Sequence, residues 1–306
     1  MTYDLVIVGG GPAGLTAGIY AARAKIQALI VERALAGGKL ASVDLIENYP
    51  GFPEPISGAE LSSRMEEQVR RLGVPIKNAD VAEVKVLPDG FVLRTRDEEI
   101  TAKTVIWATG SGPSPLGVPG EDRLRGRGVS YCAICDGFFF RDQEVAVVGG
   151  GDSAVQEALY LTRFVKKVYL IHRRDTFRAT PILLEQLEAN PKIEKIVNTV
   201  VKEIKGEEGV TGLELEEVTT GRQSFLPVSG VFIYVGVKPA SHLVQDLVDL
   251  DRHGYIITDE KMATRTPGLF AAGDVRQKPL RQIVTAVADG AIAAMSAERY
   301  LRERKG

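Results

Sequence analysis

Two cysteines separated by two residues, Cys132 and Cys135, are the side chains of this chain best suited to chemistry, and the other 304 of its 306 residues include no cysteine. This spacing lets two sulfur atoms close a small ring, and a position at a helix start lowers the pKa of one thiol. Because the thiolate is the nucleophile in disulfide exchange, the pair predicts a redox-active dithiol. Asp136 follows directly and could exchange a proton with the pair. A role in complementing a helix dipole explains Asp136 equally well.

A metal site and a purely structural role are the other interpretations of the two cysteines. Zinc takes four ligands, but the chain has no further cysteine, and His242 and His253 lie more than 100 residues beyond the pair. A secreted fold held by disulfides would spread its cysteines along the chain. We therefore expect no metal, and two buried structural cysteines remain the weaker alternative.

A segment that contains three consecutive glycines occurs twice in the chain. Residues 4–33 align without a gap with residues 144–173, at an offset of 140. Each copy has an apolar strand, a glycine-rich loop, a helical stretch and a second apolar strand, as in a βαβ unit. We call Gly9–Gly14 the first glycine loop and Gly149–Ala154 the second glycine loop. Such loops bring the backbone and a helix N-terminus against a pyrophosphate, so two Rossmann-like dinucleotide sites are predicted.

The residues that end the second strand of each copy differ, and the difference predicts the two ligands. The first copy ends in Glu32, a carboxylate that accepts hydrogen bonds from ribose hydroxyls, as NAD and FAD sites require. The second copy has His172 there, followed by arginines that can clamp a 2′-phosphate, namely Arg173, Arg174 and Arg178. We predict FAD in the first site and NADPH in the second. A solvated charged surface is the alternative for the arginines.

Length and composition indicate a two-domain α/β protein. A chain of 306 residues exceeds what one core usually holds. Alternating segments at 81–101 and 197–228 predict small antiparallel β inserts. The predicted organisation is a discontinuous FAD-binding domain (1–113 and 242–306), an inserted NADPH-binding domain with the cysteines (116–239), and a two-strand hinge (113–116 and 238–242).

Charge and hydropathy exclude several partners. The formal net charge is −2, with 25% charged and 44% hydrophobic residues, so there is no basic surplus for nucleic acid or anionic lipid. The apolar run after the N-terminus is too short for a signal peptide, and no run approaches the length of a membrane span. We expect a soluble, cytoplasmic protein.

Further motifs extend across the whole chain. In chain order they are Gly9-Gly10-Gly11-Pro12-Ala13-Gly14, Glu47-Asn48-Tyr49-Pro50-Gly51-Phe52, Ala108-Thr109-Gly110, Cys132-Ala133-Ile134-Cys135-Asp136-Gly137, Gly149-Gly150-Gly151-Asp152-Ser153-Ala154, His172-Arg173-Arg174, Arg178-Ala179, Gly273-Asp274 and Arg281-Gln282. With these motifs the chain closely resembles the low-molecular-weight thioredoxin reductases. The dithiol within the predicted NADPH domain is the most specific feature, because other flavoprotein disulfide reductases carry theirs in the FAD domain.

The resemblance implies an activity and an assembly. Hydride passes from NADPH to FAD, the flavin reduces the Cys132–Cys135 disulfide, and the dithiol reduces thioredoxin or a thioredoxin-like protein. In the family the second cysteine, here Cys135, faces the flavin. The two domains rotate between half-reactions, and the family is homodimeric.

Motifs, strand ends and resemblance together give the candidate site residues. Those predicted to bind FAD are Gly9, Gly11, Pro12, Ala13, Gly14, Glu32, Arg33, Gly38, Lys39, Leu40, Asn48, Ala108, Thr109, Gly110, Gly273, Asp274, Arg281, Gln282 and Ile283. Those predicted to bind NADPH are Gly149, Gly151, Asp152, Ser153, Ala154, His172, Arg173, Arg174 and Arg178. Buried strands ending in a turn are the alternative for 106–110 and for 270–275, the segment that contains Asp274.

Lys39 departs from the family pattern, in which a glutamine usually follows the two glycines. A fixed positive charge near a flavin would favour its reduced form and shift its potential. An ammonium that extends into solvent is at least as good an interpretation.

Four other functions compete with the leading one. A reductase for another thioredoxin-like or glutaredoxin-like protein, or for a peroxiredoxin system, would use the same dithiol. The flavoprotein core of an alkyl hydroperoxide reductase carries an extra N-terminal domain, which we do not expect because Met1 lies just before the first strand. A ferredoxin- or flavodoxin-NADP reductase lacks the cysteine pair. A non-catalytic redox sensor would show no steady-state NADPH turnover.

Overall fold

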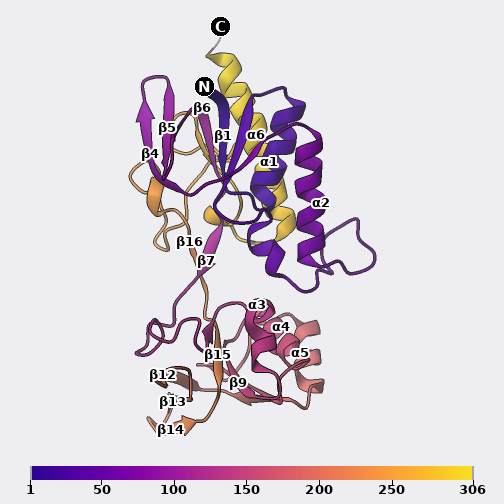
Figure 1. The fold of residues 1–306 in the computed structure, drawn as a ribbon, viewed down its shortest axis with the longest axis vertical. Helices are drawn as coiled ribbons and strands as arrows, with labels where there is room; N and C mark the ends of the chain where they lie inside the picture. Colours follow the sequence, from indigo (N-terminus) through magenta and orange to yellow (C-terminus); the bar gives the residue numbers. More distant parts are fainter. Residues whose placement is uncertain (1, 305–306) are drawn as a thin grey trace. The chain divides into compact units, whose positions relative to one another are not determined.

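The computed structural model describes residues 2–304. The chain forms two compact units: unit 1 consists of Met1–Gly112 and Lys238–Gly306, and unit 2 is Pro113–Val237. The chain crosses between them in two short strands that pair with each other, β7 (Ser111–Pro113) and β16 (Val237–Pro239) (Figure 1). Each unit contains its own parallel sheet with helices. The prediction of two Rossmann-like α/β folds, one inserted in the other, is confirmed.

Unit 1 is built on a seven-stranded sheet. Its parallel part has the order β3-β2-β1-β6, and β17 pairs in parallel with the C-terminal half of β6. A hairpin of β4 and β5 extends the N-terminal half of β6 in antiparallel fashion. The strands are β1 (Thr2–Val8), β2 (Ala28–Glu32), β3 (Ile76–Asn78), β4 (Val81–Leu87), β5 (Gly90–Thr95), β6 (Glu99–Trp107) and β17 (Leu269–Ala271). Central strands are apolar in continuous runs because both faces of the sheet are buried.

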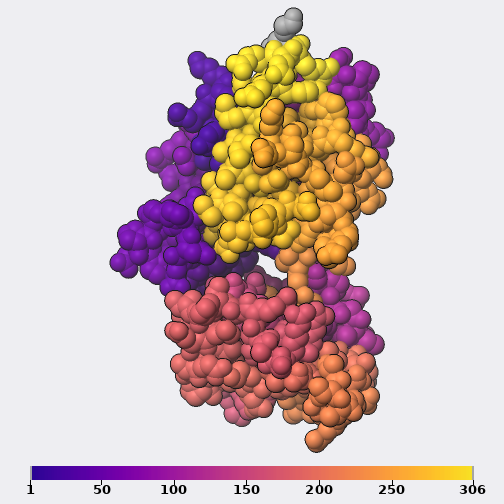
Figure 2. All heavy atoms as spheres, turned by 180° about the vertical axis from the view of Figure 1, so that it is seen from behind, coloured from indigo at the N-terminus to yellow at the C-terminus, as the bar shows by residue number. Residues whose placement is uncertain are grey.

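Three α-helices and three 3-10 helices accompany this sheet. They are α1 (Pro12–Arg23), α2 (Gly58–Arg71), α6 (Ile283–Glu303), η1 (Gly38–Ser42), η3 (His242–Val244) and η4 (Gly273–Val275). Helix α6, yellow in Figure 2, lies along one face of unit 1. It packs so closely on α1 that a Cβ added at Gly290 would lie 2.1 Å from the Ala13 carbonyl oxygen. None of the helices within residues 2–304 has the length and apolar character needed to cross a membrane.

Unit 2 has a five-stranded parallel sheet in the order β11-β10-β9-β15-β8, and a separate antiparallel sheet. The parallel strands are β8 (Val129–Ser130), β9 (Glu144–Gly149), β10 (Lys167–Ile171), β11 (Ile193–Ile196) and β15 (Gly230–Tyr234). The antiparallel strands are β12 (Thr199–Lys205), β13 (Gly212–Glu217) and β14 (Gln223–Leu226). The helices are α3 (Ala133–Asp136), η2 (Gly137–Phe140), α4 (Asp152–Leu161) and α5 (Pro181–Ala189). Both predicted β inserts, at 81–101 and 197–228, are confirmed.

Candidate active site

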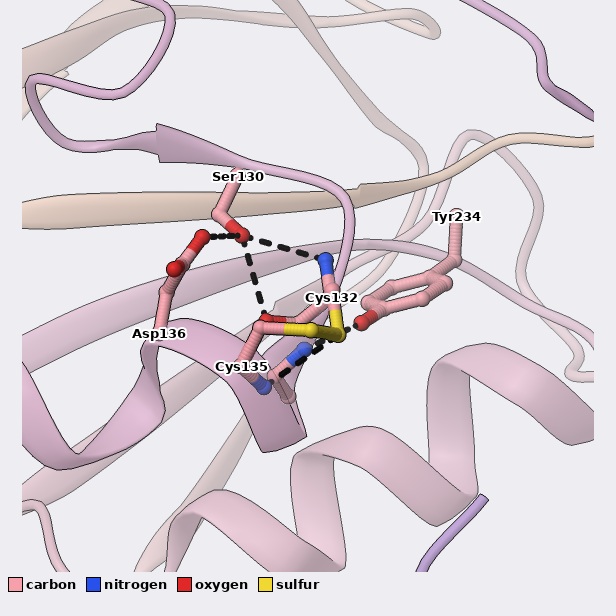
Figure 3. Close-up of a disulfide and its surroundings, with 6 residues drawn as sticks. Ser130, Cys132, Cys135, Asp136 and Tyr234 are labelled. Atoms are coloured by element: carbon pink, nitrogen blue, oxygen red, sulfur yellow. Dashed lines mark hydrogen bonds between the residues drawn. A yellow bond between two sulfur atoms is a disulfide. The ribbon is translucent and has the colours of Figure 1, made fainter. Parts of the chain in front are cut away.

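Cys132 and Cys135 form a disulfide at the start of α3, directly after β8 (Figure 3). Their Cα atoms lie 5.3 Å apart. Cys132 is the N-cap residue of α3, and its Sγ accepts a hydrogen bond from the Cys135 backbone N–H at 3.2 Å. Cys132 is half-buried, whereas Cys135 is exposed. The disulfide is therefore at a helix start, with one of its two residues at the surface.

Asp136 is connected to the cysteine pair through Ser130. The Ser130 hydroxyl donates to the Asp136 Oδ2 at 2.6 Å, and the Ser130 Oγ accepts from the Cys132 backbone N–H at 3.1 Å (Figure 3). Asp136 is the last residue of the four-residue helix α3, and its carboxylate is bound by a side chain rather than by N–H groups at the helix start. The Ser130 hydroxyl thus connects the Asp136 carboxylate to the backbone of Cys132.

Tyr234 supports the same turn from the end of β15. Its hydroxyl oxygen accepts from the Ala133 backbone N–H at 2.9 Å (Figure 3). Burial raises the pKa of Tyr234, and the nearby Glu157 carboxylate raises it further, so the hydroxyl stays protonated. Sequence reasoning missed Tyr234, which lies 101 residues from its partner. The available signal was weak: a tyrosine at the end of an apolar run, 230–234.

Two large aromatic side chains are exposed directly after the cysteine motif. Phe138 is 59% and Phe139 is 74% exposed. The Arg141 guanidinium lies over the Phe138 ring, 5.1 Å from its centroid. Exposed aromatics of this kind mark contact surfaces for other molecules. Sequence reasoning missed them, although three consecutive phenylalanines after the cysteines were a readable signal.

The first glycine loop leads from β1 into α1 and has the backbone of a nucleotide-binding turn. A Cβ added at Gly14 would lie 1.8 Å from the Gly9 carbonyl oxygen, so helix and strand approach too closely for any side chain. The N-cap residue Gly11 offers no side-chain cap, which leaves N–H groups of the first turn available to a ligand. The Glu32 Oε2 accepts from the Gly10 N–H at 2.6 Å, so the predicted ribose-binding carboxylate lies against the loop.

Polar atoms near this loop fit a bound dinucleotide. The Asp274 Oδ1 is buried and has no hydrogen-bond donor among residues 2–304, and its nearest recorded cation, the Lys278 Nζ, is 3.8 Å away. The Arg281 Nε is likewise buried without an acceptor, and the guanidinium lies 3.8 Å from the centroid of the Tyr255 ring. A carboxylate lacking a donor and a guanidinium lacking an acceptor match a ligand with hydroxyl and phosphate groups.

The remaining residues predicted for FAD line this region or form its framework. The Asn48 Nδ2 donates to the Gln282 Oε1 at 3.3 Å, so these two lie together. The Thr109 hydroxyl donates to the Ala240 carbonyl oxygen at 2.8 Å and so holds the chain crossing. The others lie at the start of α1, in η1, just after β6, at the start of η4, at the start of α6 or next to Glu32: Pro12, Ala13, Gly38, Lys39, Leu40, Ala108, Gly110, Gly273, Ile283 and Arg33.

A buried charge network in unit 1 escaped sequence reasoning. Asp289, in the middle of α6, accepts from the Gly273 N–H at 3.0 Å, from the Arg276 guanidinium at 3.1 Å and from the Lys278 ammonium at 2.9 Å. Asp289 is only 6% exposed. The network fixes the segment that carries Asp274. Its signal in the sequence was an aspartate among the alanines and valines that begin this helix.

The second glycine loop leads from β9 into α4. A Cβ added at Gly150 would lie 2.2 Å from the His172 Cε1, whereas Gly151 has open space around it. His172 is buried and stacks on Phe177, with ring centroids 5.3 Å apart. Burial lowers the pKa of His172, and the surrounding arginines lower it further. The imidazole is therefore neutral at physiological pH.

Three exposed guanidinium groups surround this neutral imidazole: Arg173, Arg174 and Arg178. No ion pair is recorded for any of them within residues 2–304. The Arg178 N–H donates to the Gly150 carbonyl oxygen at 2.7 Å, and the Asp152 Oδ1 accepts from the Thr180 N–H at 2.7 Å, so the arginine segment is bound to the loop. Ser153 is exposed beside them and Ala154 is buried against Gly149. Unpaired guanidinium groups at this edge fit a phosphate monoester.

Comparisons with known proteins agree with these features. A family model described as pyridine nucleotide-disulphide oxidoreductase matches residues 3–290. The chain is 47% identical to the thioredoxin reductase of Bacillus subtilis over 302 residues, which cover 98% of this chain and 95% of that protein. It is 47% identical to that of Mycolicibacterium smegmatis, covering 99% and 97%.

Solved structures give the same result. The crystal structure of Lactococcus lactis thioredoxin reductase matches with a TM-score of 0.96 at 47% identity, covering 98% of this chain and 99% of that one. Thioredoxin reductase from T. acidophilum matches with a TM-score of 0.92 at 37% identity, covering 97% and 98%. This chain therefore belongs to the pyridine nucleotide-disulphide oxidoreductase family, among its low-molecular-weight thioredoxin reductases.

Proposed function

We propose that this chain is an NADPH-dependent thioredoxin-disulfide reductase, in which electrons pass from NADPH through FAD to the Cys132–Cys135 disulfide and then to thioredoxin. The observation that carries the proposal is a disulfide located in the same unit as an arginine-flanked glycine loop. The names of the relatives support thioredoxin as the partner.

Each unit would hold one dinucleotide. In unit 1 the start of α1, Glu32, Asp274 and Arg281 would hold FAD, and in unit 2 the second glycine loop and its arginines would hold NADPH. When bound, the flavin supplies a carrier that accepts a hydride and delivers two electrons to a disulfide. In this proposal residues 1–113 and 242–306 form the FAD domain and 116–239 the NADPH domain.

The dithiol performs the exchange with the partner. Reduction of the disulfide adds two electrons and two protons, and we assign the transfer of one proton to Asp136, which Ser130 holds beside the pair. One cysteine thiolate then attacks a sulfur atom of the thioredoxin disulfide, which releases one thioredoxin thiolate and forms a mixed disulfide. The other cysteine attacks the mixed disulfide, restores the Cys132–Cys135 bond and releases reduced thioredoxin.

Partner contact, domain rotation and assembly complete the proposal. The exposed Phe138 and Phe139 lie next to the disulfide in sequence and would contact the partner protein. Rotation about the hinge 113–116 and 238–242, which overlaps the ends of the paired crossings β7 and β16, would alternate access to the flavin. We also propose a homodimer located in the cytoplasm, as in the family.

Reduction of a chromogenic disulfide by purified protein, NADPH and thioredoxin tests the proposal. Cys132→Ser and Cys135→Ser should each abolish turnover while the protein keeps its yellow flavin. Ile134→Val, which changes one of the two residues between the cysteines, is the matched control and should retain activity.

The result also identifies the partner. Turnover with a glutaredoxin-like protein or a peroxiredoxin, but not with thioredoxin, would replace thioredoxin in the proposal. Full activity in either cysteine variant, or no NADPH oxidation with any disulfide partner, would show that the chain is not this kind of reductase.

A further inference from the structure

The turn that carries the disulfide is tied to strand β15 by a long-range hydrogen bond. The N–H groups of Cys132, Cys135 and Asp136 have acceptors that are at most four residues away in sequence. The Ala133 N–H instead donates to the Tyr234 hydroxyl at 2.9 Å, across 101 residues of the chain (Figure 3). Ala133 is fully buried, so water cannot replace this acceptor. The hydrogen bond therefore fixes the turn to a different part of unit 2.

Tyr234 is itself held in place by the packing of its backbone. It is the last residue of β15 and pairs with Gly149, the first residue of the second glycine loop. A Cβ added at Gly149 would lie 2.5 Å from the Tyr234 carbonyl oxygen and 2.7 Å from the Ala154 Cβ, so no side chain fits there. The Tyr234 ring packs against the same core as α4 and Ala133. Its hydroxyl is therefore a fixed acceptor, against which the disulfide turn is positioned.

The disulfide and this hydrogen bond restrict the same turn. In the structure the sulfur–sulfur bond is closed and the Ala133 N–H reaches its acceptor, so one conformation of the turn satisfies both constraints. Two constraints that favour one conformation stabilise each other, and this coupling is reciprocal. Reduction opens the sulfur–sulfur bond and gives the turn more conformations, including those in which the N–H lies away from Tyr234. The hydrogen bond therefore contributes more to the disulfide form than to the dithiol form.

We propose that Tyr234 is a positioning residue that stabilises the Cys132–Cys135 disulfide relative to the dithiol and so makes the dithiol a stronger reductant. This inference rests on the proposed function, in which the pair is reduced and then passes two electrons to the disulfide of a partner protein. That transfer is more complete when the enzyme's own disulfide is the more stable product. Tyr234 acts on this equilibrium through the backbone of Ala133.

Anaerobic equilibration of the purified holoprotein with mixtures of dihydrolipoate and lipoate tests Tyr234 directly. Reduction converts one dihydrolipoate to its cyclic disulfide and the protein disulfide to two thiols, which alkylation and mass spectrometry count. Tyr234→Phe keeps the ring and removes the hydroxyl, so the equilibrium constant for reduction of the protein disulfide should rise about two- to tenfold. Tyr169→Phe removes a hydroxyl of the same unit that bonds to Glu144, and should match wild type.

Urea unfolding of the oxidised and the reduced holoprotein measures the same coupling from its other side. Tyr234→Phe should lower the folding equilibrium constant of the oxidised form more than that of the reduced form, by the factor seen in the reduction equilibrium. An equal loss in both forms, an unchanged reduction equilibrium, or an equal shift in Tyr169→Phe would overturn the inference. Neither measurement uses NADPH or thioredoxin. A wild-type protein without NADPH-driven thioredoxin reduction would therefore overturn the proposed function without altering either measurement.

Discussion

The two glycine loops share a backbone plan but differ in the residue that the middle glycine faces. In unit 1 the Gly10 N–H donates to Glu32, and a Cβ at Gly10 would lie 3.1 Å from the Glu32 Cβ. In unit 2 a Cβ at Gly150 would overlap the His172 ring. The middle glycine therefore makes room in both units for the residue that ends the second strand, and this residue distinguishes the two sites.

The two units also differ in whether their charged side chains near the predicted sites are paired within the protein. Unit 1 buries Asp289 together with two cations, Arg276 and Lys278, which it pairs within the protein. Unit 2 keeps Arg173, Arg174 and Arg178 exposed around a neutral imidazole. One fold can thus serve two ligands, because each ligand responds to the charges that the protein leaves uncompensated. The following changes test this contrast, from the largest expected effect to the smallest.

Asp289→Ala should have the largest effect, because it leaves Arg276 and Lys278 buried without their shared carboxylate. Loss of one partner from a buried ion pair costs about 3–5 kcal/mol, so unit 1 should unfold at lower urea concentration and lose flavin. Asp175→Ala removes an exposed carboxylate from unit 2 and is the matched control. Unfolding followed by urea titration and flavin absorbance measures both. Equal stability of the two variants would show that the network in α6 is dispensable.

Gly14→Ala should have the second-largest effect. It tests whether the helix approaches the strand equally closely in the two glycine loops. The equivalent residue of unit 2, at the offset of 140, is already an alanine, Ala154. In unit 1 the added Cβ would lie 1.8 Å from a backbone oxygen, so α1 must move away from β1, at a cost of about 3 kcal/mol. The matched control is Gly151→Ala, which has open space and should keep the stability of wild type. Thermal unfolding and flavin content would separate them. Full tolerance of Gly14→Ala would contradict the tight packing.

These tests concern features that local sequence patterns predict to different degrees. The strands, glycine loops and β inserts could be predicted because hydrophobic periodicity and glycine spacing are local properties of the chain. Ser130 lies within the cysteine motif region, yet its hydroxyl could accept or donate in many directions, and only the folded turn directs it to Asp136. Tyr234 and Asp289 depend on contacts between separate segments, which no local pattern specifies.

Arg173→Gln combined with Arg174→Gln tests the unpaired charges of unit 2. Hydrogen bonds between charged groups contribute about 1.5–3 kcal/mol, so the Michaelis constant for NADPH should rise about 10- to 100-fold. The constant for NADH, which lacks the 2′-phosphate, should change little. Glu32→Gln in unit 1 is the counterpart and should leave the preference for NADPH unchanged. Equal changes for both nucleotides would remove the arginines from phosphate recognition.

Glu121 is a buried carboxylate of unit 2 for which the described part of the chain, residues 2–304, shows no ion pair, unlike Asp289 of unit 1. It is 3% exposed, and its oxygens accept from the Tyr131 hydroxyl and from backbone N–H groups of residues 116–118. Burial alone would raise the pKa of Glu121, but these hydrogen bonds outweigh burial and hold the pKa below its usual value. Tyr131 directly precedes Cys132, so this carboxylate fixes the segment that enters the disulfide.

Tyr131→Phe should therefore have a small effect that depends on pH. A carboxyl group with a lower pKa in the folded state stabilises the fold above its unfolded pKa of about 4.3, and this contribution is lost as pH falls from there through the folded pKa. Removing the hydroxyl should cost about 1 kcal/mol at pH 7 and less in acid, because a protonated Glu121 accepts a weaker hydrogen bond. Urea unfolding at pH 7 and near pH 3.5 measures the difference, with Tyr20→Phe, at a tyrosine that is 41% exposed, as a surface control. A loss of stability that is the same at both pH values would mean that Tyr131 acts by packing alone.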